Sequence, residues 1–80
     1  MKTGEAVNHP AYYNRGTMEV IDIIKAVLSY HPDISPFQAW LVGTIVKYLC
    51  RFGGKDDVIQ EIAKMLWYTE ALKKDMEDRK

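Results

Sequence analysis

Cationic side chains gather in the segment 47–55, where one predicted helix ends and the next begins. Lys47 and Arg51 are four residues apart, so on a helix they share one face. Gly53 follows where helices commonly end, because glycine adopts a positive φ without a Cβ clash. Lys55 can fold back toward the same cations. The three cations could bind a phosphate or carboxylate group, although cations in a last turn also stabilise a helix by about 0.3 to 1 kcal/mol each.

Four further side chains could act with these cations: His9, Tyr13, Lys64 and Tyr68. Lys64 and Tyr68 are four residues apart on a predicted helix, so they could reach one ligand together. Lysine and arginine neutralise phosphate oxygens, and an aromatic ring stacks on a nucleobase for about 1 to 3 kcal/mol. We therefore expect cations from two successive helices to converge on one anion pocket that suits a nucleotide. The same side chains could equally bind an acidic protein surface.

His9 has three roles that the residues alone leave open. It could be a general base, a donor to phosphate or a hydrogen-bonded packing residue. No metal-ligand partners stand at suitable spacing, so the sequence favours packing.

The composition argues against several classes of protein. Eleven basic residues balance eleven acidic ones, so the chain lacks the positive charge of a general nucleic-acid-binding protein. No Gly-x-x-x-x-Gly-Lys-Ser/Thr phosphate loop is present. One cysteine and two histidines, without a His-x-x-x-His pair, predict no structural zinc site. Glu61 and Glu70 are too far apart, and too mixed with lysines, to resemble the clustered carboxylates of helical magnesium pyrophosphatases.

The same inventory favours a cytoplasmic protein that does not span a membrane. Met1 and Lys2 lead into polar residues, not into the apolar run of a signal peptide. No stretch approaches the roughly 20 apolar residues that a bilayer requires. The single cysteine, Cys50, stands in an apolar segment and is typical of a small buried residue in a reducing compartment.

The spacing of apolar residues predicts an all-α fold: one domain of three helices with an irregular N-terminal arm. Residues 1–16 form the expected arm, which we expect to dock on the helices, and residues 17–80 form the helical part. Thr17 is a suitable N-cap for a helix over residues 18–30. Pro32 ends this helix, because proline cannot continue the hydrogen-bond ladder.

Two more helices follow the first. Ser35 followed by Pro36 is a strong start signal for a helix that runs to about Phe52. Asp56 or Asp57 can cap a third helix that reaches into the 70s. The expected core stripes are Phe37, Trp40, Leu41, Ile45, Tyr48, Leu49 and Phe52 in the second helix, and Val58, Ile59, Ile62, Leu66 and Met76 in the third.

The apolar content predicts a homo-oligomer. A chain of this length buries only about 60 to 65% of its unfolded surface, yet 48% of its residues are apolar. Three short helices cannot hide so many side chains in a monomer. Gly43 costs about 1 kcal/mol against alanine inside a helix, so it indicates the close approach of another backbone or of a ligand, with a helix contact favoured.

Four segments match one family pattern in order and spacing. They are His9-Pro10-Ala11-Tyr12-Tyr13, Glu19-Val20-Ile21-Asp22, the stretch 43–55 with Gly43, Lys47, Tyr48, Arg51, Gly53 and Lys55, and Ile62-Ala63-Lys64-Met65-Leu66-Trp67-Tyr68. Over residues 8–68 the chain resembles the SaV-like domain of unknown function, a family of small tailed-phage proteins. Two positions depart from the pattern, since Tyr12 stands where the family has a histidine and Thr44 where it has an asparagine.

The resemblance implies a nucleotide kinase-like role. A similar domain forms the C-terminal part of a longer phage protein associated with phosphorylating deoxynucleoside monophosphates without a Walker motif. By this similarity the phosphate contacts would be Lys47, Arg51 and Lys55. Lys64 would offset charge in the transferring group, Tyr13 or Tyr68 would contact the base or sugar, and His9 would orient groups or relay a proton. The donor would be a nucleoside triphosphate with Mg²⁺, in the cytoplasm of an infected bacterium.

Two other interpretations remain. A non-catalytic phage module that binds and inhibits a host protein suits the small size, the zero net charge and the surplus of tryptophan and tyrosine, which dominate protein interfaces. In a purely structural interpretation, the cations cap helices and form ion pairs with Glu61 or Asp57.

Overall fold

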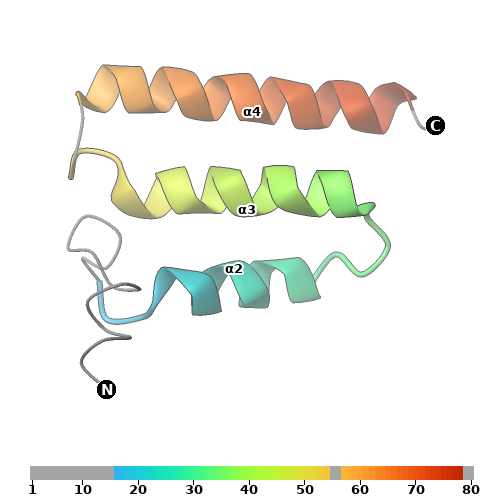
Figure 1. The fold of residues 1–80 in the computed structure, drawn as a ribbon, viewed down its shortest axis with the longest axis horizontal. Helices are drawn as coiled ribbons and strands as arrows, with labels where there is room; N and C mark the ends of the chain where they lie inside the picture. Colours follow the sequence, from blue (N-terminus) through green and yellow to red (C-terminus); the bar gives the residue numbers. More distant parts are fainter. Residues whose placement is uncertain (1–15, 55–56, 79–80) are drawn as a thin grey trace.

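The computed structural model describes residues 16–54 and 57–78, which form three α-helices. The helices lie side by side in one layer, with the second between the other two (Figure 1). They are α2 (Val20–Ser29), α3 (Pro36–Arg51) and α4 (Val58–Asp78). α3 packs against both neighbours, whereas α2 and α4 do not contact each other. The predicted all-α class is confirmed, and the expected arm falls almost wholly outside the described residues.

The first helix begins two residues later than predicted. Glu19 is the N-cap, with an extended backbone, and its side chain does not cap the helix. Its carbonyl accepts the first helical hydrogen bonds, from the amides of Asp22 and Ile23 at 3.0 and 3.1 Å. The prediction that Thr17 caps this helix is therefore wrong, because the helical hydrogen bonds start at Glu19. The helix ends at Ser29, one residue before the predicted end.

The start of α3 is as predicted. Ser35 accepts a hydrogen bond from the Gln38 amide, and the Gln38 side chain accepts one from the Ser35 amide, both at 3.1 Å. This reciprocal capping box satisfies two amides that the first helical turn leaves without partners. Pro36 occupies the first turn, where its missing N–H costs nothing.

The turn after α3 depends on a glycine. The Phe52 amide donates to the Tyr48 carbonyl at 3.0 Å, and the Gly54 amide closes the turn on the Arg51 carbonyl at 2.9 Å. Between them Gly53 has φ of 85°, a left-handed conformation that residues with a Cβ adopt at a cost of about 1 to 2 kcal/mol. The expected helix stop at Gly53 is confirmed.

Gly53→Ala should therefore lower the free energy of unfolding by about 1 to 2 kcal/mol. Urea denaturation followed by far-ultraviolet circular dichroism measures this change. Gly16→Ala is the matched control, since a Cβ at Gly16 would meet nothing within 4 Å. Equal effects of the two substitutions would contradict the explanation.

Asp57 caps α4, as one of the two predicted alternatives. Its carboxylate accepts a hydrogen bond from the Gln60 amide at 3.2 Å, and its carbonyl accepts one from the Glu61 amide at 3.1 Å. The far end of α4 is charged, with exposed ion pairs between Lys73 and Glu77 and between Lys74 and Asp78. None of the described helices combines the length and the apolar composition that crossing a membrane requires.

The buried core is small and partly polar. Among the described residues the buried apolar side chains are Leu41, Val46 and Tyr48, and the buried polar ones are Gln38, Thr44, Arg51 and Glu61. The Gln38 amide donates to the Asp75 carboxylate at 2.9 Å and so joins the start of α3 to the end of α4. In a single layer each helix meets its neighbours only along its sides, so none of the three described helices covers either face of the layer.

The predicted core stripes are therefore partly wrong. Leu41 and Tyr48 are buried as expected, but the exposed members of the two stripes are Phe37, Trp40, Leu49, Phe52, Val58, Ile59, Ile62, Leu66 and Met76. The side of α4 that meets α3 includes Glu61, which is fully buried. The side of α4 that packs against α3 is therefore the one that carries Glu61, and not its most apolar stripe.

The expectation at Gly43 is supported by the packing of α2 on α3. A Cβ at this position would lie 3.3 Å from the Cγ2 atom of Ile24 in α2. Such a separation is shorter than ordinary van der Waals contact, because carbon atoms pack best about 3.5 to 4.0 Å apart. Gly43 therefore lets the two helices approach closely.

Candidate functional site

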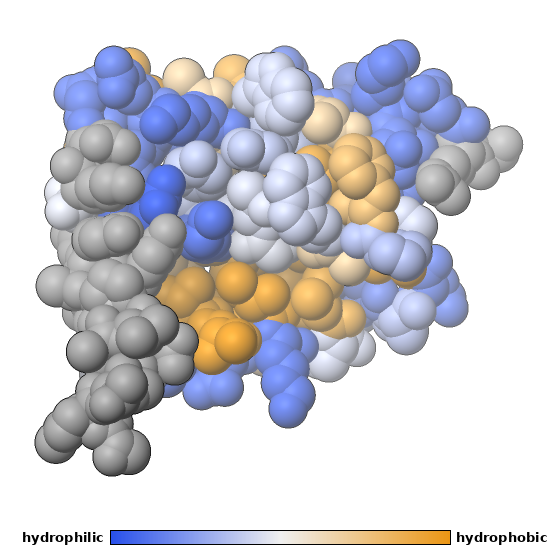
Figure 2. Space-filling view, in the orientation of Figure 1, coloured by the Kyte–Doolittle hydropathy of each residue, from blue (hydrophilic) through white to orange (hydrophobic). Residues whose placement is uncertain are grey.

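Aromatic rings join α3 to α4 on one face of the layer. The Tyr68 ring stacks on Tyr48 with centroids 5.8 Å apart and meets Trp40 and Trp67 edge-on at 5.7 and 5.1 Å. Figure 2 shows this face, where pale side chains cover the middle of α3 and α4. Edge-to-face and offset-stacked pairs contribute about 0.5 to 1.5 kcal/mol each beyond area burial. The cluster therefore gives this face a fixed aromatic surface.

A cavity of about 400 Å³ lies in this surface. Its lining residues are Tyr48, Lys64, Trp67 and Tyr68. The Trp67 side chain is 64% exposed and Lys64 is also exposed, whereas Tyr48 is buried. The cavity thus has an aromatic floor from α3 and an accessible indole and ammonium group from α4.

A buried ion pair holds one wall of the cavity in place. The Arg51 Nε atom lies 3.4 Å from the Glu61 Oε1 atom, and the two side chains are 8% and 0% exposed. The Arg51 guanidinium also lies over the Tyr48 ring, 4.6 Å from its centroid. Removing one partner of a buried ion pair is strongly destabilising, because it leaves the other charge buried and uncompensated, whereas replacing both partners with apolar residues is often neutral. The ion pair therefore fixes the packing of α3 against α4, and the Arg51 guanidinium holds the Tyr48 ring in its position.

Lys47 lines a neighbouring cavity of about 320 Å³ between α2 and α3. Ile24, Trp40, Gly43 and Thr44 line it too, together with Ala39. The Thr44 hydroxyl donates to the Trp40 carbonyl at 2.8 Å, so this hydrogen bond stays within its own helix. Because the Trp40 ring also meets Tyr68, the two cavities adjoin.

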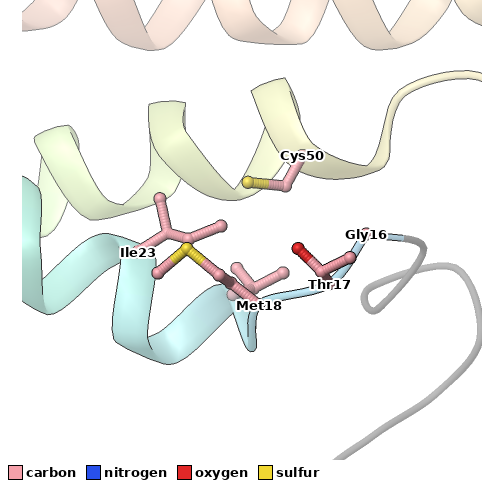
Figure 3. A pocket seen from close by; sticks show the side chains of 6 residues that line it. Gly16, Thr17, Met18, Ile23 and Cys50 are labelled. Carbon is pink, nitrogen blue, oxygen red and sulfur yellow. The ribbon is translucent and has the colours of Figure 1, made fainter.

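A third cavity, of about 250 Å³, has a mostly apolar lining that also includes Thr17. Figure 3 shows it between α2 and the end of α3, with Met18, Ile23 and Cys50 facing one another. Burial raises the pKa of the Cys50 thiol above its ordinary value, so less of it is the reactive thiolate. This agrees with the interpretation of Cys50 as a small apolar residue.

The predicted site residues are distributed as follows. Lys64 and Tyr68 line one cavity together, as their spacing indicated. Lys47 lines the adjoining cavity. Arg51 pairs with Glu61, as the structural interpretation proposed. Lys47 and Lys64 thus line two adjoining cavities, whereas one shared anion pocket was expected. His9, Tyr13 and Lys55 lie outside the described residues, so their roles stay predictions.

Two aromatic residues of the cavity were not among the predicted ligand contacts. Tyr48 was expected in the core, because a helical stripe of aromatics is usually core, and Trp67 was named only as part of a segment that matches the family pattern. One signal could have identified them: Lys64, Trp67 and Tyr68 fall within about 1.1 helical turns, so an indole and a phenol lie beside the same lysine.

No group of three or more His, Cys, Asp or Glu side chains is placed to hold a metal ion within residues 16–54 and 57–78. No curated protein and no solved structure matches the chain. One family model does match, over residues 7–70, and its description is a protein of unknown function, DUF3310. This stretch nearly coincides with residues 8–68, where the sequence resembles a domain of unknown function. The chain belongs to the DUF3310 family.

Proposed function

We propose that the protein binds a deoxynucleotide in the cavity lined by Tyr48, Lys64, Trp67 and Tyr68. The observation that supports this most is the combination of one ammonium group with three aromatic rings around a cavity of about 400 Å³. Small-molecule sites typically have volumes of about 300 to 1,000 Å³ and a mostly apolar lining with few polar groups. A nucleotide needs both an aromatic surface for its base and a cation for its phosphate.

The geometry suggests a division of roles. The exposed Trp67 indole offers a face on which a base can stack, and every nucleobase has a π-face suited to such stacking. The Lys64 ammonium supplies charge for the phosphate. Lys47, in the adjoining cavity, supplies a second charge for a longer phosphate chain. Arg51 keeps the Tyr48 ring in place through its ion pair with Glu61, so we give it a positioning role.

Phosphate transfer is the finer part of the proposal, and it rests on the resemblance. It would use a nucleoside triphosphate with Mg²⁺ as donor and His9 or Lys64 at the transferring group, in a phage protein acting in the bacterial cytoplasm. Nucleotide binding is the property to test first, because an enzyme without affinity for the nucleotide cannot position it for transfer.

Lys64→Ala should weaken binding of a deoxynucleoside monophosphate about 10- to 150-fold, since one charge-assisted contact to phosphate contributes about 1.5 to 3 kcal/mol. A thermal-shift screen first identifies the nucleotide that binds, because a ligand at a hundredfold its dissociation constant stabilises the folded protein by about 2.7 kcal/mol. Calorimetric titration with that nucleotide then measures the change in affinity. Lys73→Ala is the matched control, as Lys73 is exposed on the same helix and pairs with Glu77. If none of the deoxynucleotides stabilises or binds the wild-type protein, the proposal fails.

A second candidate function is binding of a host protein through the same aromatic face. Phe37, Trp40 and Trp67 are exposed there at 48, 56 and 64%, and tryptophan anchors often dominate protein interfaces. A pull-down from host lysate with wild-type protein and Trp67→Ala distinguishes the two. A stoichiometric partner lost in the variant, with no nucleotide binding, would favour the host protein.

A further inference from the structure

The two adjoining cavities contain the same pair of chemical groups. The larger cavity has the exposed indole of Trp67 and the ammonium group of Lys64. The smaller has the exposed indole of Trp40 and the ammonium group of Lys47. Among the described residues, the other side chains that line the two cavities carry no charge. Each cavity therefore combines one accessible aromatic ring with one positive charge.

Neighbouring rings hold both indoles in place before a ligand binds. Phe37 stacks on Trp40, with centroids 6.2 Å apart and ring planes at 21°. The Tyr68 ring meets both indoles edge-on. A ring that is already held in one orientation loses less conformational entropy when a ligand stacks on it. Both cavities are thus preformed for stacking.

The two indoles are close enough for one short ligand to reach both. The Tyr68 centroid lies 5.7 Å from the Trp40 ring and 5.1 Å from the Trp67 ring. The centroids of the two indoles are therefore separated by at most the sum of these distances, about 11 Å. In a single strand the bases can turn apart from one another and stack on separate aromatic side chains. Two neighbouring nucleotides can thus place one base on each indole.

We infer that the two cavities together bind two successive nucleotides of single-stranded DNA, an inference that rests on the proposed nucleotide site. One base stacks on Trp67 with its phosphate near Lys64, and the next stacks on Trp40 with its phosphate near Lys47. A longer phosphate chain alone would use Lys47 but not the indole beside it, whereas a second nucleotide uses both. Stacking of this kind tolerates any base, because every base has a π-face.

The charges of the two cavities match those of a strand. Each phosphodiester carries one negative charge, and each cavity supplies one ammonium group. Two separate mononucleotides would bring about 1.5 to 2 negative charges each, because a terminal phosphate ionises twice, and would exceed the two ammonium charges. The zero net charge of the chain agrees with a contact of two nucleotides, since long strands are bound through many cations.

The test compares the four deoxynucleoside monophosphates with the four 5′-phosphorylated dinucleotides of the same bases, by calorimetric titration of the full chain. A dinucleotide should bind once per chain and about 5- to 150-fold more tightly than its mononucleotide, the factor that one stacked base contributes. Trp40→Ala should lower this ratio of affinities to about 1. Tyr30→Ala is the matched control, because it removes an aromatic ring that is 79% exposed and lines neither cavity, and it should keep the wild-type ratio.

A second measurement covers the case in which Trp40→Ala does not fold. In the wild-type complex with the dinucleotide, nuclear Overhauser contacts should connect one base to the Trp40 ring and the other to the Trp67 ring. Contacts from Trp67 alone would overturn the inference.

The comparison separates this inference from the proposed function. If a mononucleotide binds and its dinucleotide binds no more tightly, the second subsite does not exist, while the proposed nucleotide site stands. Two mononucleotides bound per chain, without tighter binding of the dinucleotide, would also overturn the inference, because the cavities would then serve separate ligands. If neither class of ligand binds, both the inference and the proposed function fail.

Discussion

Replacing Arg51 with alanine is expected to lower the free energy of unfolding by about 3 to 5 kcal/mol. The Glu61 carboxylate is 0% exposed and would lose the guanidinium 3.4 Å away, which shares its burial. The Tyr48 ring would lose the cation above it as well. For a domain of this size such a loss is a large fraction of the total stability. Urea denaturation followed by circular dichroism measures it.

Two controls separate this effect from a general loss of charge. Lys73→Ala removes an exposed pair with Glu77 at 3.9 Å and should cost no more than about 1 kcal/mol. The double variant Arg51→Met with Glu61→Leu should recover most of the stability, since apolar pairs often replace buried ion pairs without loss. An Arg51→Ala variant as stable as Lys73→Ala would show that the pair does not hold the helices together.

Leu41→Ala should be the other large destabilisation, at about 2 to 5 kcal/mol. Leu41 is 0% exposed in the middle helix, and the described core has few other buried apolar side chains to fill the space. The substitution would leave a cavity beside α3, and the neighbouring helices would move in to fill it only in part. Thermal and urea unfolding both report the change.

Leu41→Met is the matched control for this prediction. It keeps the volume and the apolar character and should cost less than about 1.5 kcal/mol. If alanine and methionine at this position gave the same stability, Leu41 would not be a packing centre of the fold.

Local signals in the sequence predicted the elements well. Ser35 and Pro36 marked the start of α3, Gly53 its end and Asp57 the cap of α4, because each acts through hydrogen bonds or φ within a few residues. The start of α2 was misplaced by two residues, since the Glu19 carbonyl begins its hydrogen-bond ladder without any side-chain cap.

The packing of the elements was harder to predict. Apolar periodicity alone placed Ile59, Ile62 and Leu66 in the core, but the fully buried residue of α4 is Glu61. A single chain cannot show from periodicity whether an apolar stripe meets another helix of its own or a second copy. Which side of α4 packs against α3 depends on polar contacts between the helices, such as the ion pair of Arg51 with Glu61. The partners of this pair lie on either side of the turn, so periodicity within one helix does not reveal it.

The candidate site was predicted in part for the same reason. The spacing of Lys64 and Tyr68 within one helix predicted that they could reach one ligand together, and both line one cavity. Whether cations from two helices converge on one pocket was not predictable, because it depends on how α3 is rotated about its axis relative to α4. That rotation turns Arg51 into the interface and brings Tyr48 instead to the cavity.

Nuclear magnetic resonance of the two indole N–H groups tests the central claim most directly. The full chain, labelled with ¹⁵N, is titrated with a deoxynucleoside monophosphate, and Trp67→Phe assigns the two signals. The account predicts that the Trp67 indole signal moves progressively and saturates, because a base stacks on its exposed ring. A Trp67 signal that stays unchanged at saturating nucleotide would contradict it.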